Sequence, residues 1–123
     1  MRRFLATLAV LSCTLVTAGA CGGSGSSSPS DTSGDRPKVI DVTFSGDSVT
    51  PNGDRVEVGV GQPIELKVTA DAPGEIHVHS SPEQELAYDK GTTTLDLKPI
   101  EQPGIVEVES HHLEKTIVQL EVR

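Results

Sequence analysis

The chain has 123 residues, with 18 acidic and 10 basic side chains, four histidines, two cysteines and three aromatic residues, enough for one small domain. Its formal charge of −8 argues against a nucleic-acid partner, because phosphate binding requires a clustered basic surface. No run of about 20 apolar residues is present, so the sequence predicts no membrane-spanning helix in the mature protein.

The first 20 residues have the features of a secretion signal. Arg2 and Arg3 supply a positive start, residues 4–16 form a short apolar core, and small residues precede Cys21. We therefore expect residues 1–20 to be removed during export.

Cys21 ends a segment, Ala-Gly-Ala-Cys at 18–21, that resembles the lipobox of bacterial lipoproteins. The resemblance implies cleavage before Cys21 and attachment of a diacylglyceryl lipid to its sulfur. The lipid would hold the protein to the extracytoplasmic face of the cell membrane. Cleavage by an ordinary signal peptidase, which leaves a free thiol, is the alternative. Lipidation at Cys13 would leave an apolar core of only about eight residues.

Cleavage at this position also removes most of the sulfur. Cys13 and Met1 leave with the signal, and Cys21 becomes a thioether, so no disulfide is possible. Residues 22–36 are rich in Gly and Ser and contain no large apolar side chain, which predicts a flexible tether over 21–36. The predicted folded domain, 37–123, contains neither cysteine nor methionine.

Apolar and polar side chains alternate in short segments from Pro37 onward, which predicts β-strands with one buried face. The segments are 40–44, 56–60, 64–68, 95–97, 106–108 and 118–122. Pro, Gly, Asn and Asp separate them, and no apolar stripe of helical period occurs. We therefore predict an antiparallel β-sandwich with a core of Val, Ile and Leu, because Phe44 and Tyr88 are the only aromatic residues of the domain.

Four segments resemble the cupredoxin fold, and more closely the cupredoxin-like domains of bacterial envelope lipoproteins. The carriers are Arg55–Val58 with Gly61-Gln62-Pro63, Glu75–His79, Pro103–Glu109 and Gln119–Val122. The resemblance covers residues 38–122 and implies a Greek-key β-sandwich. The family includes copper electron-transfer proteins and members with other metals or none.

In copper-bearing members a cysteine ends the strand that begins with Pro-Gly. Counting from Pro103-Gly104 places that position at about Ser110, which shares the inward parity of Val106 and Val108. A blue-copper centre requires a cysteine thiolate, which serine does not replace. We therefore expect no electron transfer by type 1 copper.

All four histidines fall in two clusters, His77 with His79 and His111 with His112. Residues i and i+2 of a strand project from one face about 6.6 Å apart, so the first pair can approach one ion at about 2.0–2.1 Å. The resemblance places the loop after Glu109 at the same end of the sandwich as the end of the middle strand. Either His111 or His112 would then complete the site, because adjacent side chains point apart.

Glu75, Glu109 and Glu114 are candidate oxygen donors for this site. Imidazole ligands favour Cu(II) or Zn(II), with Ni(II) as a further choice, and the lack of sulfur disfavours Cu(I). The first hypothesis is therefore a membrane-tethered domain that binds Cu(II) or Zn(II).

In the second hypothesis the histidines bind no metal ion. His77 and His79 alternate with Ile76 and Val78, which also fits the solvated face of a strand. The protein would then be a metal-free scaffold for another envelope protein. We expect no enzymatic activity, because no nucleophile motif or triad spacing is present; a zinc hydrolase would need an open water position and a nearby base.

Overall fold

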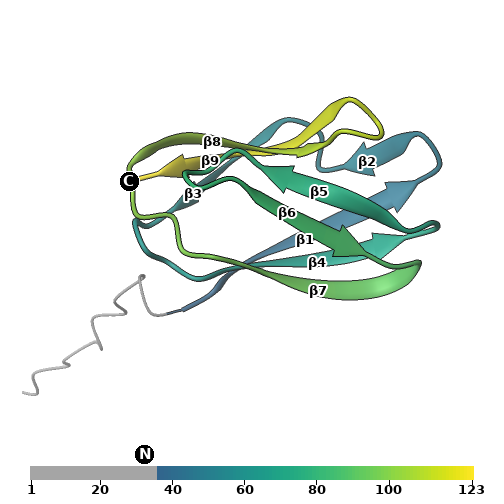
Figure 1. The fold of residues 1–123 in the computed structure, drawn as a ribbon, viewed down its shortest axis with the longest axis horizontal. Helices are drawn as coiled ribbons and strands as arrows, with labels where there is room; N and C mark the ends of the chain where they lie inside the picture. Colours follow the sequence, from purple (N-terminus) through teal and green to yellow (C-terminus); the bar gives the residue numbers. More distant parts are fainter. Residues whose placement is uncertain (1–35) are drawn as a thin grey trace, which may run out of the picture. The chain divides into compact units, whose positions relative to one another are not determined.

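Residues 36–123 are described by a computed structural model, in which they form two β-sheets and no helix (Figure 1). The predicted signal, the lipidation site Cys21 and the tether up to residue 35 lie outside the described residues. Residues 36–123 contain no helix that could cross a membrane. The strands are β1 (Lys38–Ser45), β2 (Ser48–Thr50), β3 (Asp54–Val58), β4 (Ile64–Ala70), β5 (Gly74–Val78), β6 (Gln84–Tyr88), β7 (Gly91–Leu97), β8 (Gly104–Ser110) and β9 (Lys115–Val122).

The two sheets lie face to face, which confirms the predicted β-sandwich. One sheet has the order β2-β1-β4-β7 and the other β3-β9-β8-β5-β6. Both are mixed, because β1 pairs with β4 and β3 pairs with β9 in parallel. The prediction of an antiparallel sandwich is therefore wrong for these two pairs, whereas the other five described pairs are antiparallel. Alternation shows which side chains face the core, but it carries no information on strand direction.

The core consists mainly of aliphatic side chains from the inner faces of both sheets, as predicted. Leu66, Ile76 and Leu120 are fully buried. Phe44 from β1 stacks on Tyr88 from β6 with ring centroids 4.8 Å apart, so these two aromatic residues join the layers.

The segment after β3 departs from the predicted alternation. The strand ends at Val58, and the Val60 side chain is 45% exposed instead of buried. The buried Gln62 holds this turn, since its Oε1 accepts a hydrogen bond from Gly59 N–H at 2.8 Å and its Nε2 donates to the Arg36 carbonyl at 2.9 Å. In this segment the polar side chain of Gln62 is therefore buried, whereas the apolar side chain of Val60, which the alternation predicts to be buried, is exposed.

Candidate metal site

His77 and His79 lie on the outer face of the five-stranded sheet. Ile76 and Val78 of β5 point into the core and are fully buried, so the alternating histidines project from the opposite face. His77 is directly opposite Glu85 on β6 and Glu109 on β8. The His77 side chain is nevertheless only 12% exposed, because neighbouring side chains cover it.

His111 reaches the same place from the connection between β8 and β9. Its ring stacks on His77 with centroids 3.8 Å apart and lies 5.7 Å from the ring of His79. Because β5 and β8 are antiparallel, this connection extends toward the start of β5 rather than its end. The expectation that it lies at the end of β5 was therefore wrong, and the three histidines meet over the face of the sheet.

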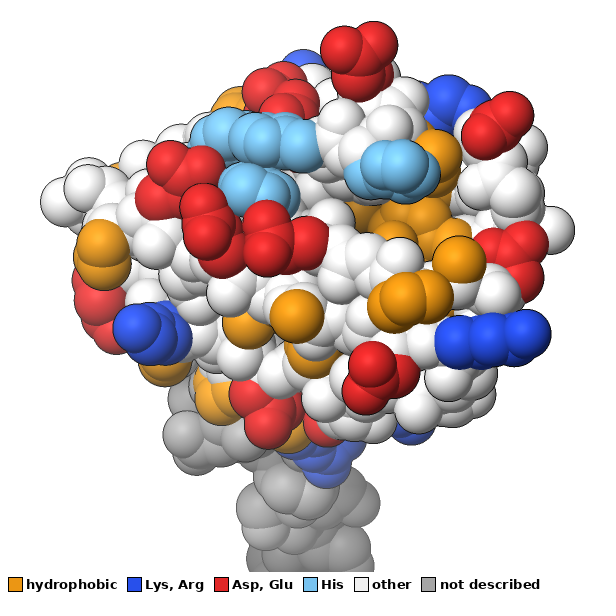
Figure 2. Space-filling model, turned by 45° about the vertical axis from the view of Figure 1, so that its right-hand side comes forward, with side chains coloured by type: hydrophobic (Ala, Val, Ile, Leu, Met, Phe, Trp, Pro, Cys, Tyr) orange, Lys and Arg blue, Asp and Glu red, His pale blue; other side chains and the backbone are white. Residues whose placement is uncertain are grey.

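His112 lies apart from the other three histidines. It lines a small cavity of about 60 Å³ with Phe44, Asp71, Tyr88 and Leu113. Figure 2 shows histidine surface gathered beside acidic side chains, with a further histidine surface set apart near hydrophobic side chains. Of His111 and His112, only His111 joins the cluster. This agrees with the expectation that the side chains of adjacent residues point apart.

Two carboxylates form hydrogen bonds with the Nε2 atoms of the cluster. Glu75 Oε1 lies 2.5 Å from His77 Nε2, and Glu109 Oε2 lies 2.8 Å from His79 Nε2. An ionised carboxylate only accepts hydrogen bonds, so each Nε2 carries the proton. In the neutral imidazole this leaves Nδ1 as the lone-pair atom, the arrangement in which a carboxylate orients a metal-binding histidine.

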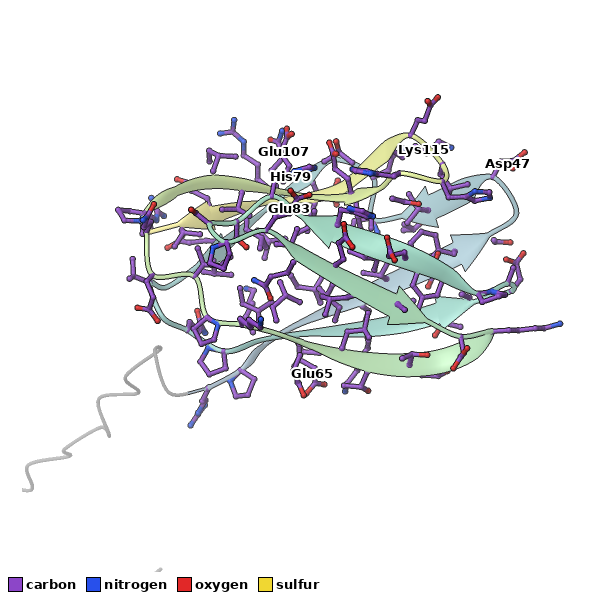
Figure 3. All side chains as sticks on the ribbon, in the orientation of Figure 1. Asp47, Glu65, His79, Glu83, Glu107 and Lys115 are labelled. Atoms are coloured by element: carbon purple, nitrogen blue, oxygen red, sulfur yellow. The ribbon has the colours of Figure 1, made fainter. Side chains whose placement is uncertain are left out.

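Both Nδ1 atoms face carboxylates at a longer separation. His77 Nδ1 is 3.8 Å from Glu83 Oε1 and 3.7 Å from Glu85 Oε1, and His79 Nδ1 is 3.6 Å from Glu83 Oε1. Figure 3 shows Glu83 close to His79. These separations are too long for hydrogen bonds but close to the roughly 3.4 Å between two donors of one tetrahedral ion. His77 Nδ1 is also buried, and no group in the described part of the chain forms a hydrogen bond with it.

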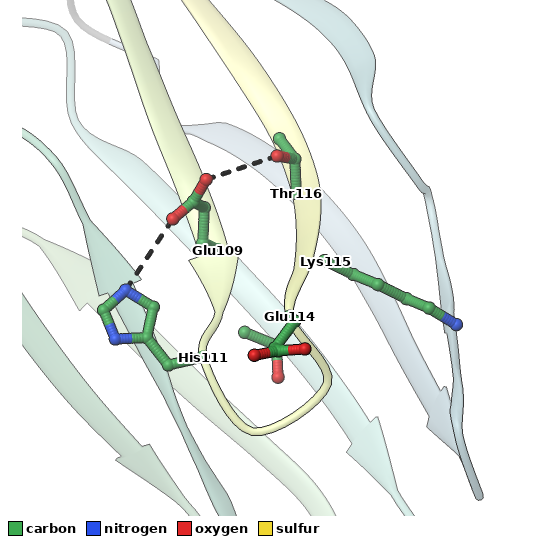
Figure 4. Close-up of a pocket in the computed structure, with 6 residues that line it drawn as sticks. Glu109, His111, Glu114, Lys115 and Thr116 are labelled. Carbon is green, nitrogen blue, oxygen red and sulfur yellow. Dashed lines mark hydrogen bonds and ion pairs between the residues drawn. The ribbon is translucent and has the colours of Figure 1, made fainter.

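Glu109 is held from both sides (Figure 4). Thr116 Oγ1 donates to its Oε1 at 3.3 Å, and His111 Nε2 lies 3.7 Å from its Oε2. A register shift between β8 and β9 brings Thr116 opposite Glu109, while Ile117 and Val118 are both buried. The hydrogen bond from His79 is the main cause that holds the pKa of Glu109 below its ordinary value.

The carboxylates around the histidines were predicted in part. Glu75 and Glu109 were candidates and both contact a histidine. Glu114 forms no ion pair with a described histidine and instead lines a cavity of about 480 Å³ beside His111. Glu83 and Glu85 were missed, because only the pairing of β5 with β6 brings them to His77.

The ligand atoms fall into two groups. His79, Glu109 and His111 offer atoms that all lie within 4.8 Å of one another, and Glu75, His77 and Glu85 form a second such group. Imidazole and carboxylate donors at this spacing suit a divalent cation such as Zn(II) or Cu(II).

Ser110 points away from both groups. Its side chain is 1% exposed on the core side of β8, and its Oγ accepts a hydrogen bond from Leu113 N–H at 3.4 Å. The predicted inward parity of Ser110 is confirmed. Residues 36–123 contain no cysteine or methionine, so these donors do not fit a type 1 copper centre.

Comparison with known proteins supports the fold. No family model and no curated protein matches the chain. Among solved structures, it is similar to a novel purple cupredoxin from Nitrosopumilus maritimus, with a TM-score of 0.50 and 14% identity over 70% of this chain and 99% of that chain. At this identity the similarity concerns the fold alone, and residues 36–123 form a β-sandwich with a cupredoxin-like fold.

Proposed function

We propose that this protein is a membrane-tethered lipoprotein whose cupredoxin-like domain binds Cu(II) or Zn(II) on the outer face of its five-stranded sheet. The observation that carries the proposal is the convergence of His77, His79 and His111 on a group of glutamates, with ring centroids 3.8 and 5.7 Å apart. Histidines on a merely solvated strand face need no such partners. The name of the structural neighbour, a cupredoxin, is a further reason to test copper.

The donor set defines the chemistry of the proposed site. Neutral imidazole nitrogens and carboxylate oxygens favour Cu(II) and Zn(II) over Cu(I), which prefers sulfur. The site would capture or present a divalent ion without the redox chemistry of a blue-copper centre. Its exposure fits exchange with solvent, since the His79 and His111 side chains are 38% and 52% exposed.

Isothermal titration of the purified full-length chain with Zn(II) or Cu(II) tests metal binding. The thiols are alkylated beforehand, so that cysteine does not contribute. We expect saturable uptake near neutral pH that is lost in the double variant His77→Ala/His79→Ala and kept in His112→Ala. Absence of uptake, or uptake unchanged in the double variant, would reject the site and favour the metal-free scaffold, for which partner binding is indifferent to chelator.

Lipid attachment is tested separately by labelling expressing bacteria with a radioactive fatty acid. Cys21→Ser should abolish incorporation, whereas Cys13→Ser should leave it unchanged. Incorporation that survives Cys21→Ser would reject this tether and leave the metal proposal untouched.

A further inference from the structure

The stacking of His77 on His111 limits how these histidines share metal. Their centroids are 3.8 Å apart and their planes differ by 16°. An imidazole binds metal along a lone pair that lies in the plane of the ring. Two nearly parallel, stacked rings direct their lone pairs along separate planes, so in this arrangement a single ion does not meet both nitrogens at about 2.0–2.1 Å.

The two donor groups provide the alternative. We propose that the cluster binds two divalent cations at adjacent positions, an inference that rests on the metal-binding function proposed above. The inner position is formed by His77 and Glu85 of the second group together with Glu83, which faces the same Nδ1 atom of His77. Glu75, the third member of that group, is hydrogen-bonded to the far nitrogen of His77 and orients the ring. The outer position is formed by His79, Glu109 and His111. There the ion would replace the proton that His79 Nε2 donates to Glu109 in the metal-free structure, so this imidazole would bind through Nε2.

The buried Nδ1 of His77 independently supports the inner position. Because Nε2–H donates to Glu75, Nδ1 presents a lone pair that requires a donor or a cation. Within residues 36–123 it has no hydrogen-bond partner, and the groups that face it at 3.7 and 3.8 Å are carboxylates, which are acceptors. A cation between Nδ1 and these oxygens satisfies all three groups, whereas a buried unpaired polar atom is otherwise costly.

The charge of the cluster matches two divalent ions. Glu75, Glu83, Glu85 and Glu109 each have a carboxylate oxygen within 4.0 Å of a ring nitrogen of the cluster. With neutral imidazoles these four carboxylates carry four negative charges, which two divalent cations balance and one does not. Glu83 Oε1 lies 3.8 Å from His77 Nδ1 and 3.6 Å from His79 Nδ1, so one carboxylate faces a histidine of each position.

Native mass spectrometry of the thiol-alkylated full-length chain with Zn(II) chloride measures the number of bound ions. We expect two ions for the wild type, one for His111→Ala, one for the double variant Glu83→Gln/Glu85→Gln, and two for the control His112→Ala. The substituted side chains are at least half exposed at His111, Glu83 and Glu85, so these changes spare the core. Circular dichroism verifies the fold of each variant.

Each outcome has a distinct meaning. One ion in the wild type, or loss of all metal in both variants, would overturn the two-ion arrangement while leaving metal binding intact. No bound ion in the wild type would reject the proposed function itself. With Cu(II) in place of Zn(II), the electron paramagnetic resonance spectrum should broaden by dipolar coupling between one and two equivalents. An unbroadened sum of two isolated centres would contradict adjacency.

Discussion

Ser110 and Glu109 are neighbours in the chain but lie on opposite faces of β8. Ser110 is 1% exposed and points into the core, whereas the Glu109 carboxylate accepts a hydrogen bond from His79 Nε2 at 2.8 Å on the outer face. The position that the cupredoxin resemblance gives to the copper cysteine is therefore separated from the histidines by the sheet itself.

This separation predicts that Ser110→Cys does not create a blue-copper centre. The new thiol would face the core, so it could not share an ion with His77, His79 and His111. Visible absorption after addition of Cu(II) should show no intense thiolate charge-transfer band, in contrast to the strong colour of a type 1 site. An intense blue or purple chromophore in this variant would show that the histidines lie within reach of residue 110.

Metal affinity should fall as the solution is acidified. Imidazole takes up its proton between about pH 8 and 5, and a protonated ring has no lone pair for metal, so binding releases protons. Titrations with Zn(II) in buffers from about pH 8 to pH 5 should show progressively weaker binding. Affinity that does not change over this range would exclude histidine ligands.

The phenol of Tyr88 should ionise only at high pH. Burial, together with the negative charge of Asp71, raises the pKa of Tyr88 above its usual value of 10.0. A raised folded-state pKa contributes stability that is complete below about pH 10 and is lost as the pH rises through the folded-state value. Because the chain has one tyrosine, ultraviolet absorbance of tyrosinate reports it directly.

Asp71→Asn should lower this midpoint, while Asp96→Asn, on β7, should leave it unchanged. The variant Tyr88→Phe should lose less stability above pH 10 than the wild type does. A wild-type midpoint at or below 10 would contradict the burial of the phenol.

Gly74→Ala should destabilise the domain. An added Cβ at Gly74 would overlap the hydroxyl and ring of Tyr88, its cross-strand partner. Relief requires movement of an aromatic ring in the core, and such overpacking costs about 1–3 kcal/mol. Gly59→Ala is the matched control, because its Cβ would meet Gln62 at an ordinary 3.6 Å. Equal urea midpoints for the two variants would show that the Tyr88 ring moves freely.

Gln84→Met should also lower the free energy of unfolding. The Gln84 side chain is buried, accepts a hydrogen bond from Lys98 N–H at 2.7 Å and donates to the Lys98 carbonyl at 3.2 Å. Methionine has a similar volume but leaves the backbone groups of Lys98 unpaired, at a cost of about 1–3 kcal/mol. Gln119→Met, at a half-buried outward position, should cost about 0.5 kcal/mol. Urea denaturation compares them, and equal losses would contradict the role of Gln84.

The alternation of apolar and polar residues is enough to predict which side chains face the core in most of the domain. Alternation at Ile40, Val42 and Phe44 is sufficient because a strand has a period of two, and one buried face selects the apolar set. The same argument gives Ser110 its inward direction and places His77 and His79 together on one face.

The neighbours of those faces could not be predicted in the same way. The parallel pairing of β1 with β4, the position of Glu85 opposite His77 and the return of His111 over the sheet depend on contacts between distant segments. The direction of each strand and its pairing partner depend on how the two sheets bury their shared core. The alternation within one strand does not specify either of them.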